Sequence, residues 1–237
     1  TVEVVEAVDN SKNVATIGAG ASLGNCGLIV TSHLVPLCAP GAIWHETQRW
    51  LQGRSPLYIK LAPDKKRFLW LLNFALKCNR EHLAHAIKAR EQILTHSRKL
   101  YAKLFQEEQI ECDWEERGVL MIFKSRSAMQ KYAKTNAFLK PYGHDAVPVI
   151  GDELYRLEPA LRKGLYGAWH HKSDGHLRPD KLMHAWQRVL TAQGVAVQEN
   201  CRLKSLIDGE GQVRGARTAG GTYTADAYVL STGAWTP

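Results

Sequence analysis

Val14-Ala-Thr-Ile-Gly-Ala-Gly-Ala-Ser-Leu-Gly24 is the stretch on which the fold assignment depends, because an apolar, strand-like run leads directly into closely spaced glycines. The glycine spacing is G-x-G-x-x-x-G, one residue longer than the usual dinucleotide-binding fingerprint. That fingerprint also needs a helix after the glycines, so that the helix N-terminus meets a pyrophosphate. Here Asn25-Cys-Gly27 and an extended Leu-Ile-Val follow. The stretch is therefore predicted to be a glycine-rich loop within an α/β fold.

The residues before this loop suggest a different position in a βαβ unit. Val2 to Val5 reads as a short β-branched strand that ends at Glu6. In dinucleotide-binding units, an acidic residue at the end of the second strand binds the ribose hydroxyls. If this strand is the second one, Glu6 is the ribose-binding acid, and the fingerprint glycines would lie upstream of Thr1. A solvated acid at a strand end is the alternative, and the sequence favours neither.

The pattern of apolar residues changes twice along the chain. Short extended segments and turns fill the first part, where Pro36 and Pro40 exclude a helix. The middle has helical periodicity, with one helix predicted to start at Asp64 and a longer one over residues 80–105. The last part returns to strands around a helix that starts at Pro179. Further strands are predicted at 118–123, 147–150, 195–197, 203–207, 213–218 and 228–231, with helix caps at Ser127 and Asp152 and turns at Asp208-Gly209 and Gly220-Gly221.

This order of segments predicts an α/β fold in which a nucleotide-binding, Rossmann-like domain is interrupted by an inserted α+β domain. Residues 1–54 and 173–237 would form the two parts of the nucleotide-binding domain, and residues 55–172 would form the insertion. The strand from Val2 to Glu6 and the strand from Tyr228 to Ser231 are then expected in the same sheet.

The charge balance leaves two interpretations open. The net charge is +8, from 31 Lys and Arg against 23 Asp and Glu. Because the basic residues are dispersed along the chain, solvated helix faces explain most of them. An anionic partner is the alternative: a phosphorylated cofactor, a membrane surface or a nucleic acid. No nucleic-acid-binding motif accompanies the charge, so no nucleic-acid partner is expected.

Cysteine usage and hydropathy indicate the compartment. The five cysteines are odd in number, far apart and without a C-x-x-C pair. Reduced thiols in the cytoplasm fit this pattern better than a disulfide framework or a zinc ribbon. The most apolar stretch, Phe68 to Leu76, is too short to span a bilayer.

A metal site is a less favoured alternative. His170, His171, Asp174 and His176 lie close together in the sequence, and His82 and His85 lie one helical turn apart. None of the usual ligand spacings occurs, however, and Asp174-Gly175 also suits a turn before the helix at Pro179. We therefore expect no metal.

Several short blocks, taken in order, resemble the D-amino acid dehydrogenases and their glycine oxidase-like relatives in the D-amino acid oxidase superfamily. The resemblance covers nearly the whole chain, and the ordered combination of blocks is more specific than any single block. These blocks are Ser22–His33, Pro36–Gly41, Ser55–Lys60, Leu157–Leu161, Asp174–Pro179 and Ala227–Trp235.

The resemblance implies a flavoprotein with FAD as cofactor. It places Glu6 at the ribose and the segment from Ser22 to Gly27 along the pyrophosphate and the flavin ring. The implied cofactor-binding residues are Glu6, Ser22, Gly24, Asn25, Gly27, Leu203 (through its backbone, at the adenine), and Gly233 and Ala234 in a turn that closes over the cofactor. His33 falls in a loop near the substrate face of the flavin, where a hydrogen-bonded loop histidine is a simpler interpretation than a catalytic one.

The implied activity is oxidation of the carbon–nitrogen bond of a D-amino acid or similar small amine, with quinone or oxygen as electron acceptor. The flavin does this chemistry, and the protein supplies orientation and electrostatics. The resemblance also implies an internal piece of a cytoplasmic enzyme, inactive by itself, with peripheral contact to the inner face of the plasma membrane. Two alternatives remain: an NAD(P)-dependent oxidoreductase that uses Gly18 to Gly24, and a basic binding module without enzymatic activity.

Overall fold

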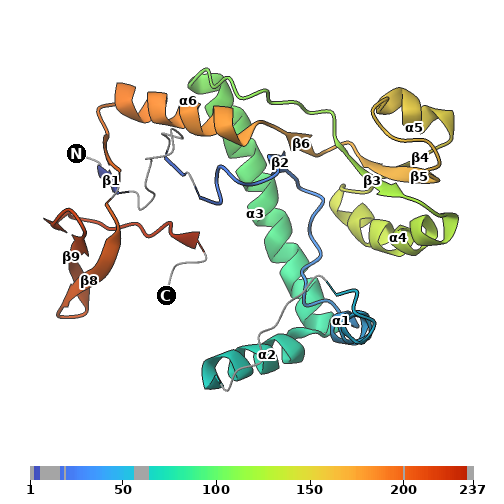
Figure 1. The fold of residues 1–237 in the computed structure, drawn as a ribbon, viewed down its shortest axis with the longest axis horizontal. Helices are drawn as coiled ribbons and strands as arrows, with labels where there is room; N and C mark the ends of the chain where they lie inside the picture. The colour runs from blue at the N-terminus through green and yellow to red at the C-terminus, as the bar shows by residue number, and fades with distance from the viewer. Residues whose placement is uncertain (1–2, 6–16, 19, 56–63, 200, 234–237) are drawn as a thin grey trace. The chain divides into compact units, whose positions relative to one another are not determined.

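The computed structural model describes residues 3–5, 17–18, 20–55, 64–199 and 201–233 (Figure 1). The chain divides into two compact units. The first unit comprises Thr1–Gly27, Phe105–Trp114 and Leu177–Pro237, and the second unit comprises Leu28–Leu104 and Glu115–His176. The fold is a mixed α/β arrangement, as the sequence predicts.

The second unit contains an antiparallel sheet of three strands. Its order is β3 (Val119–Phe123), β5 (Gly167–His171) and β4 (Val147–Ile150). Helix α4 (Arg126–Leu139) packs on this sheet, and α5 (Asp152–Leu157) follows β4 (Figure 1). The 3₁₀ turn η1 (Lys140–Tyr142) directly follows α4. Apolar side chains between these elements form a small core. Its buried members are Val149, Leu154 and Ala168.

The same unit contains helices α1 (Ala42–Leu51) and α2 (Lys65–Lys77) and most of α3 (Arg80–Glu107). Asp64 starts α2, because its carboxylate accepts hydrogen bonds from the backbone N–H groups of Lys66 and Arg67. Ile87 of α3 packs with Leu34 and Leu139 in a second buried cluster. In the described residues, no helix is long and apolar enough to cross a membrane.

A short pair of antiparallel strands brings together the first and the last residues of the second unit. Strand β2 (Leu28–Ile29) pairs with β6 (Gly175–His176), which places Thr31 and Ser32 next to the residues just before β6. Glu115 extends the pairing through a bridge to His176.

Among its described residues, the first unit contains two sheets, a helix and the last residues of α3. Strand β1 (Glu3–Val5) runs parallel to β7 (Ala196–Gln198). Helix α6 (Pro179–Ala192) precedes β7 and ends before Gly194, whose φ is 73°. The second sheet is an antiparallel meander of β8 (Leu203–Gly209), β9 (Gln212–Thr218) and β10 (Thr222–Tyr223).

The structure corrects the predicted strand from Tyr228 to Ser231. This segment is not a strand, and the partner of β1 is β7. A strand needs hydrogen-bonding neighbours for its backbone groups, and none of the described strands pairs with this segment. Val229 is 87% exposed, so the apolar side chains that suggested a buried strand are not buried here.

Three local predictions are also wrong. The hairpin between β8 and β9 turns at Glu210 and Gly211, both at positive φ, instead of at Asp208-Gly209. Ser125 instead of Ser127 caps α4, because its hydroxyl accepts the N–H of Ala128. Gly151 occupies the cap position of α5, which places Asp152 inside the first turn.

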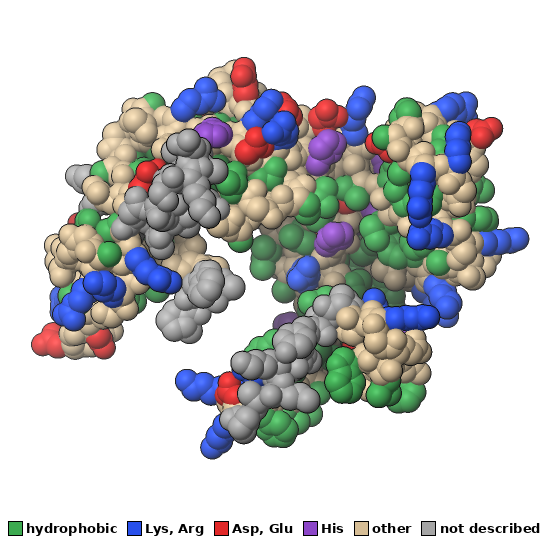
Figure 2. All heavy atoms as spheres, in the orientation of Figure 1, with side chains coloured by type: hydrophobic (Ala, Val, Ile, Leu, Met, Phe, Trp, Pro, Cys, Tyr) green, Lys and Arg blue, Asp and Glu red, His purple; other side chains and the backbone are tan. Residues whose placement is uncertain are grey.

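Basic side chains are distributed over the visible surface of the molecule, with Lys and Arg in blue in Figure 2. Several of them form exposed ion pairs, such as Lys181 with Asp113 at 2.7 Å and Arg98 with Glu116 at 2.7 Å. Such pairs contribute little to stability. The dispersed pattern agrees with solvated faces as the main source of the net charge.

Candidate cofactor-binding site

The side chain of Asn25 fixes the shape of the glycine-rich loop. Its Nδ2 donates hydrogen bonds to the carbonyl oxygens of Ser22 (2.6 Å) and Ala21 (3.3 Å). Its Oδ1 accepts the backbone N–H of Gly27 at 2.7 Å. One exposed amide therefore bridges the two sides of the loop, which accounts for an asparagine at this position.

Gly27 anchors the end of the loop. Its carbonyl oxygen accepts the N–H of Leu177 at 2.8 Å, and its φ is 67°, a conformation that favours glycine. A Cβ at Gly27 would overlap the carbonyl oxygen of Leu177. At the other end, a Cβ at Gly18 would lie 2.8 Å from the Sδ of Met183 in α6. Both ends of the loop thus lie against α6 or the residues that lead into it.

Most of the described residues in the middle of the loop are small and exposed, and Leu23 is a half-buried exception. Gly20, Ser22 and Gly24 are exposed, and a Cβ at Gly20 would meet no atom within 4 Å. The sequence has no Asp or Glu from Val14 to Trp44. Small residues let backbone N–H groups approach a phosphate closely, and the lack of acids avoids repulsion. The loop therefore fits the pyrophosphate of a dinucleotide cofactor.

The loop is not followed by a helix. Residues 20–23 form turns, and β2 comes next. The arrangement lacks the helix N-terminus that a first dinucleotide fingerprint requires, as the sequence predicts.

The other predicted cofactor residues are placed as follows. Leu203 begins β8, half-buried, where the pairing with β9 is irregular between Leu203 and Ser205. Gly233 is exposed, with φ 55°. Glu6 and Ala234 lie outside the described residues. All the described members of the predicted cofactor set belong to the first unit.

A buried carboxylate holds the segment next to His33 in the second unit. Asp174 is fully buried, and its Oδ1 accepts the N–H groups of Thr31 (2.8 Å) and Ser32 (3.1 Å). Its Oδ2 accepts the hydroxyl of Ser32 at 2.6 Å. Hydrogen bonds of this kind satisfy a buried carboxylate without a cationic partner.

Two further contacts fix the same segment. The guanidinium group of Arg90 donates to the carbonyl oxygen of His33 at 2.7 Å. Leu34 is fully buried in the cluster with Ile87 and Leu139. His33 itself is exposed. Its backbone is thus held by neighbours on both sides while the residue faces solvent.

Two of the histidines proposed as alternative metal ligands, His170 and His171, have ring nitrogens within hydrogen-bond distance of other groups. Nε2 of His171 lies 3.0 Å from the hydroxyl of Tyr132, and its Nδ1 lies 3.3 Å from the carbonyl oxygen of His144. Nε2 of His170 lies 2.9 Å from the carbonyl oxygen of Arg117. Within the described part of the chain, no three His, Cys, Asp or Glu residues gather as a metal site.

Burial shifts the pKa values of His171 and of its hydrogen-bond partner Tyr132. The pKa of His171 is lowered by burial, and the nearby carboxylate of Asp174 partly offsets this effect. The pKa of Tyr132 is raised, first by burial and then by the charge of Asp174. Both residues are therefore held neutral near pH 7.

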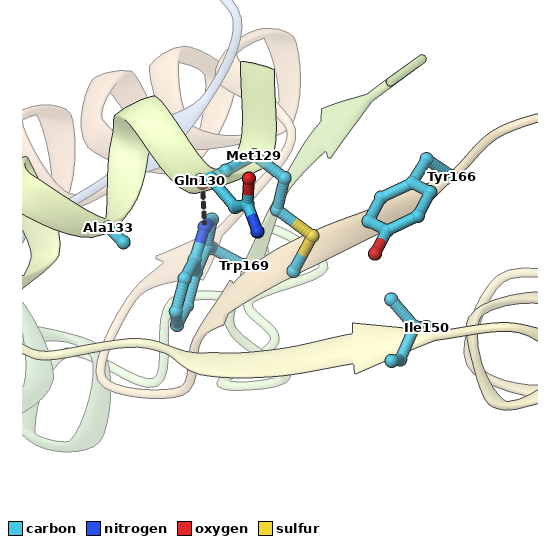
Figure 3. Close-up of a pocket in the computed structure, with 6 residues that line it drawn as sticks. All are labelled: Met129, Gln130, Ala133, Ile150, Tyr166 and Trp169. Atoms are coloured by element: carbon cyan, nitrogen blue, oxygen red, sulfur yellow. Dashed lines mark hydrogen bonds between the residues drawn. The ribbon is translucent and has the colours of Figure 1, made fainter. Parts of the chain in front are cut away.

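A hollow of about 160 Å³ lies between α4 and the strands β4 and β5 (Figure 3). Trp169 at its wall donates an indole hydrogen bond to the carbonyl oxygen of Met129 at 3.1 Å. The wall is mostly apolar and carries no Asp, Glu, His, Lys or Arg side chain. Its lining residues are Met129, Gln130, Ala133, Ile150, Tyr166 and Trp169.

Comparison with known proteins assigns the family. Residues 12–237 match the family described as DAO, FAD dependent oxidoreductase. The match covers almost the whole chain, and the chain belongs to this family. The predicted resemblance is confirmed, and FAD is the cofactor.

Solved structures show the same fold. Glycine oxidase from Geobacillus kaustophilus aligns with a TM-score of 0.59 at 18% identity, over 99% of this chain and 49% of that protein. Iminodiacetate oxidase from Chelativorans sp. BNC1 aligns with a TM-score of 0.53 at 16% identity, over 95% of this chain and 47% of that protein. The chain therefore spans about half the length of these proteins.

Asp174 and Arg90 hold the backbone of residues 31–33, and the sequence did not predict this structural role. Asp174 was predicted to be a turn residue or, as the less favoured alternative, a metal ligand. The available signal was the Thr31-Ser32 pair directly after a strand, because two adjacent N–H groups and two hydroxyls need an acceptor when they are buried.

Proposed function

We propose that this chain is part of an FAD-dependent enzyme that oxidises the carbon–nitrogen bond of a D-amino acid or a similar small amine to the imine or oxo acid. The family match over residues 12–237 carries this proposal. The acid-free loop from Ser22 to Gly27, which is exposed at Ser22 and from Gly24 to Cys26, supports it, because such a loop suits the pyrophosphate of FAD.

Each of the predicted residues would contact a particular part of FAD. Ser22, Gly24, Asn25 and Gly27 hold the pyrophosphate and the flavin edge, and Glu6 binds the ribose. The backbone of Leu203 lies at the adenine, and the turn at Gly233 and Ala234 closes over the cofactor. When bound, FAD supplies the acceptor for the hydride from the amine-bearing carbon.

We propose the same domain division that the sequence suggests. Residues 1–54 and 173–237 would carry the cofactor, and residues 55–172 would form the inserted substrate domain. The sheet of β3, β5 and β4 with α4 supports the insertion, because it has a core of its own.

The segment from Thr31 to Leu34 would border the substrate face of the flavin. Its anchoring by Asp174, Arg90 and the apolar core supports this proposal, because a binding surface needs a fixed backbone. His33 is the side chain that this segment would offer to the substrate.

The electron acceptor would be quinone or oxygen, and the protein would work in the cytoplasm at the inner face of the plasma membrane. All five cysteines are free thiols, which supports a reducing compartment. Because the chain spans about half the length of the solved relatives, we also propose that it does not turn over substrate by itself.

The test is flavin reduction in the full-length protein without oxygen. D-amino acids, their L-enantiomers, glycine and N-methylated glycine are mixed separately with the protein, and the loss of oxidised-flavin absorbance is followed. Reduction by D-amino acids or small amines supports the proposal, and reoxidation by oxygen or by a soluble quinone then identifies the acceptor. Reduction by NADH or NADPH alone would instead identify a nicotinamide-dependent enzyme.

A further inference from the structure

Two of the five cysteines, Cys38 and Cys78, belong to the second unit, and the other three lie in the first unit. Both are half-buried free thiols. Cys38 lies in the segment between β2 and α1, and Cys78 lies at the C-terminal end of α2, in the short connection to α3. They are far apart in the sequence, so only the fold can bring them together.

The segment that leads to Cys38 lies against α3 (Figure 1). Arg90 of α3 donates to the carbonyl oxygen of His33 at 2.7 Å. Closer to the start of α3, Ile87 packs with Leu34. As the chain advances from His33, its contacts on α3 therefore move toward the N-terminal end of the helix.

The same direction leads to Cys78. Val35 and Leu83 pack against the same buried cluster. The further residues from Val35 to Cys38 span at most about 10 Å. The first residue of α3, Arg80, lies about 5 Å back along the helix from Leu83. Cys38 therefore lies close to the connection in which Cys78 precedes α3.

The electrostatics of Cys78 agree with this placement. Partial burial raises the pKa of its thiol, and the charge of Cys38 raises this pKa further. A like charge acts in this way only over a short distance, so the two thiols are neighbours. The thiol of Cys78 also donates to the carbonyl oxygen of Phe74 at 3.3 Å, which holds it in one place.

We infer that Cys38 and Cys78 form a reversible disulfide, a redox-controlled crosslink between the segment that follows His33 and the start of α3. The oxidant is a low-molecular-weight disulfide such as oxidised glutathione. One protein thiolate attacks a sulfur atom of the oxidant, which gives a mixed disulfide and releases one glutathione. The second thiolate attacks the protein sulfur atom of the mixed disulfide and expels the second glutathione. The protons of the two protein thiols end on the two released glutathione molecules.

The surroundings of the pair favour a disulfide over a metal site. In the part of the chain that the structure describes, no three His, Cys, Asp or Glu residues are arranged to hold a metal, so the two thiols lack further ligands. Both thiols are only half-buried, so a small oxidant can reach them. Disulfides in the cytoplasm are mostly transient and respond to the redox state, which suits a reversible crosslink. This inference does not depend on the proposed oxidation of amines.

The crosslink restrains more than the two cysteines. Helices α1 and α2 both lie between Cys38 and Cys78 in the sequence, so the disulfide closes a loop that contains them. In the reduced protein, contacts with Asp174, Arg90 and the buried cluster hold residues 31–34. The disulfide adds an anchor a few residues later.

The experiment equilibrates the full-length, FAD-loaded protein in buffers with different ratios of reduced to oxidised glutathione. Free thiols are then blocked, and the digested protein is analysed by mass spectrometry. We expect a peptide pair that is linked through Cys38 and Cys78 in the oxidising buffer and separated again by excess reduced glutathione. Glutathione on both cysteines without a link between them, or two unmodified thiols in the most oxidising buffer, would overturn the inference.

Single substitutions test the pairing. In Cys38→Ser, Cys78 has no second thiol to expel glutathione, so the mixed disulfide should remain on Cys78. Cys78→Ser should likewise retain glutathione on Cys38. The matched control is Cys26→Ser, which removes an exposed cysteine of the first unit and should leave the link intact. Loss of the link in Cys26→Ser as well would show that the disulfide is not specific to this pair.

Thermal unfolding measures the restraint. We expect the oxidised parent to unfold several degrees above the reduced parent, because a closed loop lowers the entropy of the unfolded chain. Cys38→Ser should show no such rise between the two buffers. An unchanged midpoint in the oxidised parent would contradict a crosslink that restrains this segment.

Discussion

The hydroxyl of Ser32 donates a hydrogen bond of 2.6 Å to the buried carboxylate of Asp174, although 142 positions separate the two residues in the sequence. Strands β2 and β6 pair directly beside this contact. The carboxylate thus fixes the segment that precedes His33 at the point where the two ends of the second unit meet. We attribute the position of the His33 backbone to this contact and to Arg90.

Replacing Asp174 should destabilise the protein. Asp174→Ala leaves the N–H groups of Thr31 and Ser32 buried without an acceptor, which should lower the free energy of unfolding by about 2 to 4 kcal/mol. Asp174→Asn keeps one acceptor oxygen and should cost less. Urea unfolding measures the change in the free energy of unfolding for both variants, provided that the m-value is unchanged. The variant Asp145→Ala, at an exposed position, is the control. Equal stability of Asp174→Ala and Asp145→Ala would contradict the role of Asp174.

A side chain at Gly27 should disturb the cofactor loop. Gly27→Ala places a Cβ on the carbonyl oxygen of Leu177 at a residue with positive φ, so the backbone has to move. We expect weaker FAD retention on gel filtration of the full-length protein. Gly20→Ala, in the same loop but with free space around its Cβ, should retain FAD better. The loop assignment fails if the two variants lose FAD equally.

Stability should fall as the pH decreases through the range in which His171 titrates. Burial lowers the pKa of His171 in the folded protein, so below the unfolded value of about 6.5 the unfolded chain binds the proton more strongly. The contribution of His171 is therefore fully present above that pH and is lost below it. His171→Gln should flatten the fall in the urea midpoint between about pH 7 and 5, compared with the exposed control His85→Gln. An unchanged slope in His171→Gln would contradict this explanation.

Local chemistry made much of the fold predictable from the sequence. The carboxylate of Asp64 caps α2, the fixed φ of Pro179 suits the first turn of α6, and Gly194 lies just after its end. These signals act within a few residues, so they can be found without knowledge of the tertiary structure. The same holds for the loop before β2, whose missing helix was evident from Asn25 to Gly27.

The predictions that failed depend on contacts distant in sequence. The strand expected at Tyr228 to Ser231 has the correct residue types, but strand formation also requires a pairing partner. The hydrogen bonds that Asp174 accepts from Thr31 and Ser32 were missed, because no residue near Asp174 in the sequence indicates that Ser32 is its hydrogen-bond donor. Helix α1, by contrast, was missed because Pro36 and Pro40, which precede it, suggested a loop in this part of the chain.

The central claim is that this chain holds FAD through Glu6 and the loop from Ser22 to Gly27. Titration of the full-length apoprotein with FAD, for the parent, Glu6→Ala and the exposed control Asp208→Ala, tests it most directly. A lost carboxylate–ribose contact should raise the Kd for FAD of Glu6→Ala about tenfold to a hundredfold, with an unchanged unfolding midpoint of the apoprotein. Asp208→Ala should bind FAD like the parent. If Glu6→Ala binds FAD as tightly as the parent, the assignment of this cofactor site is wrong.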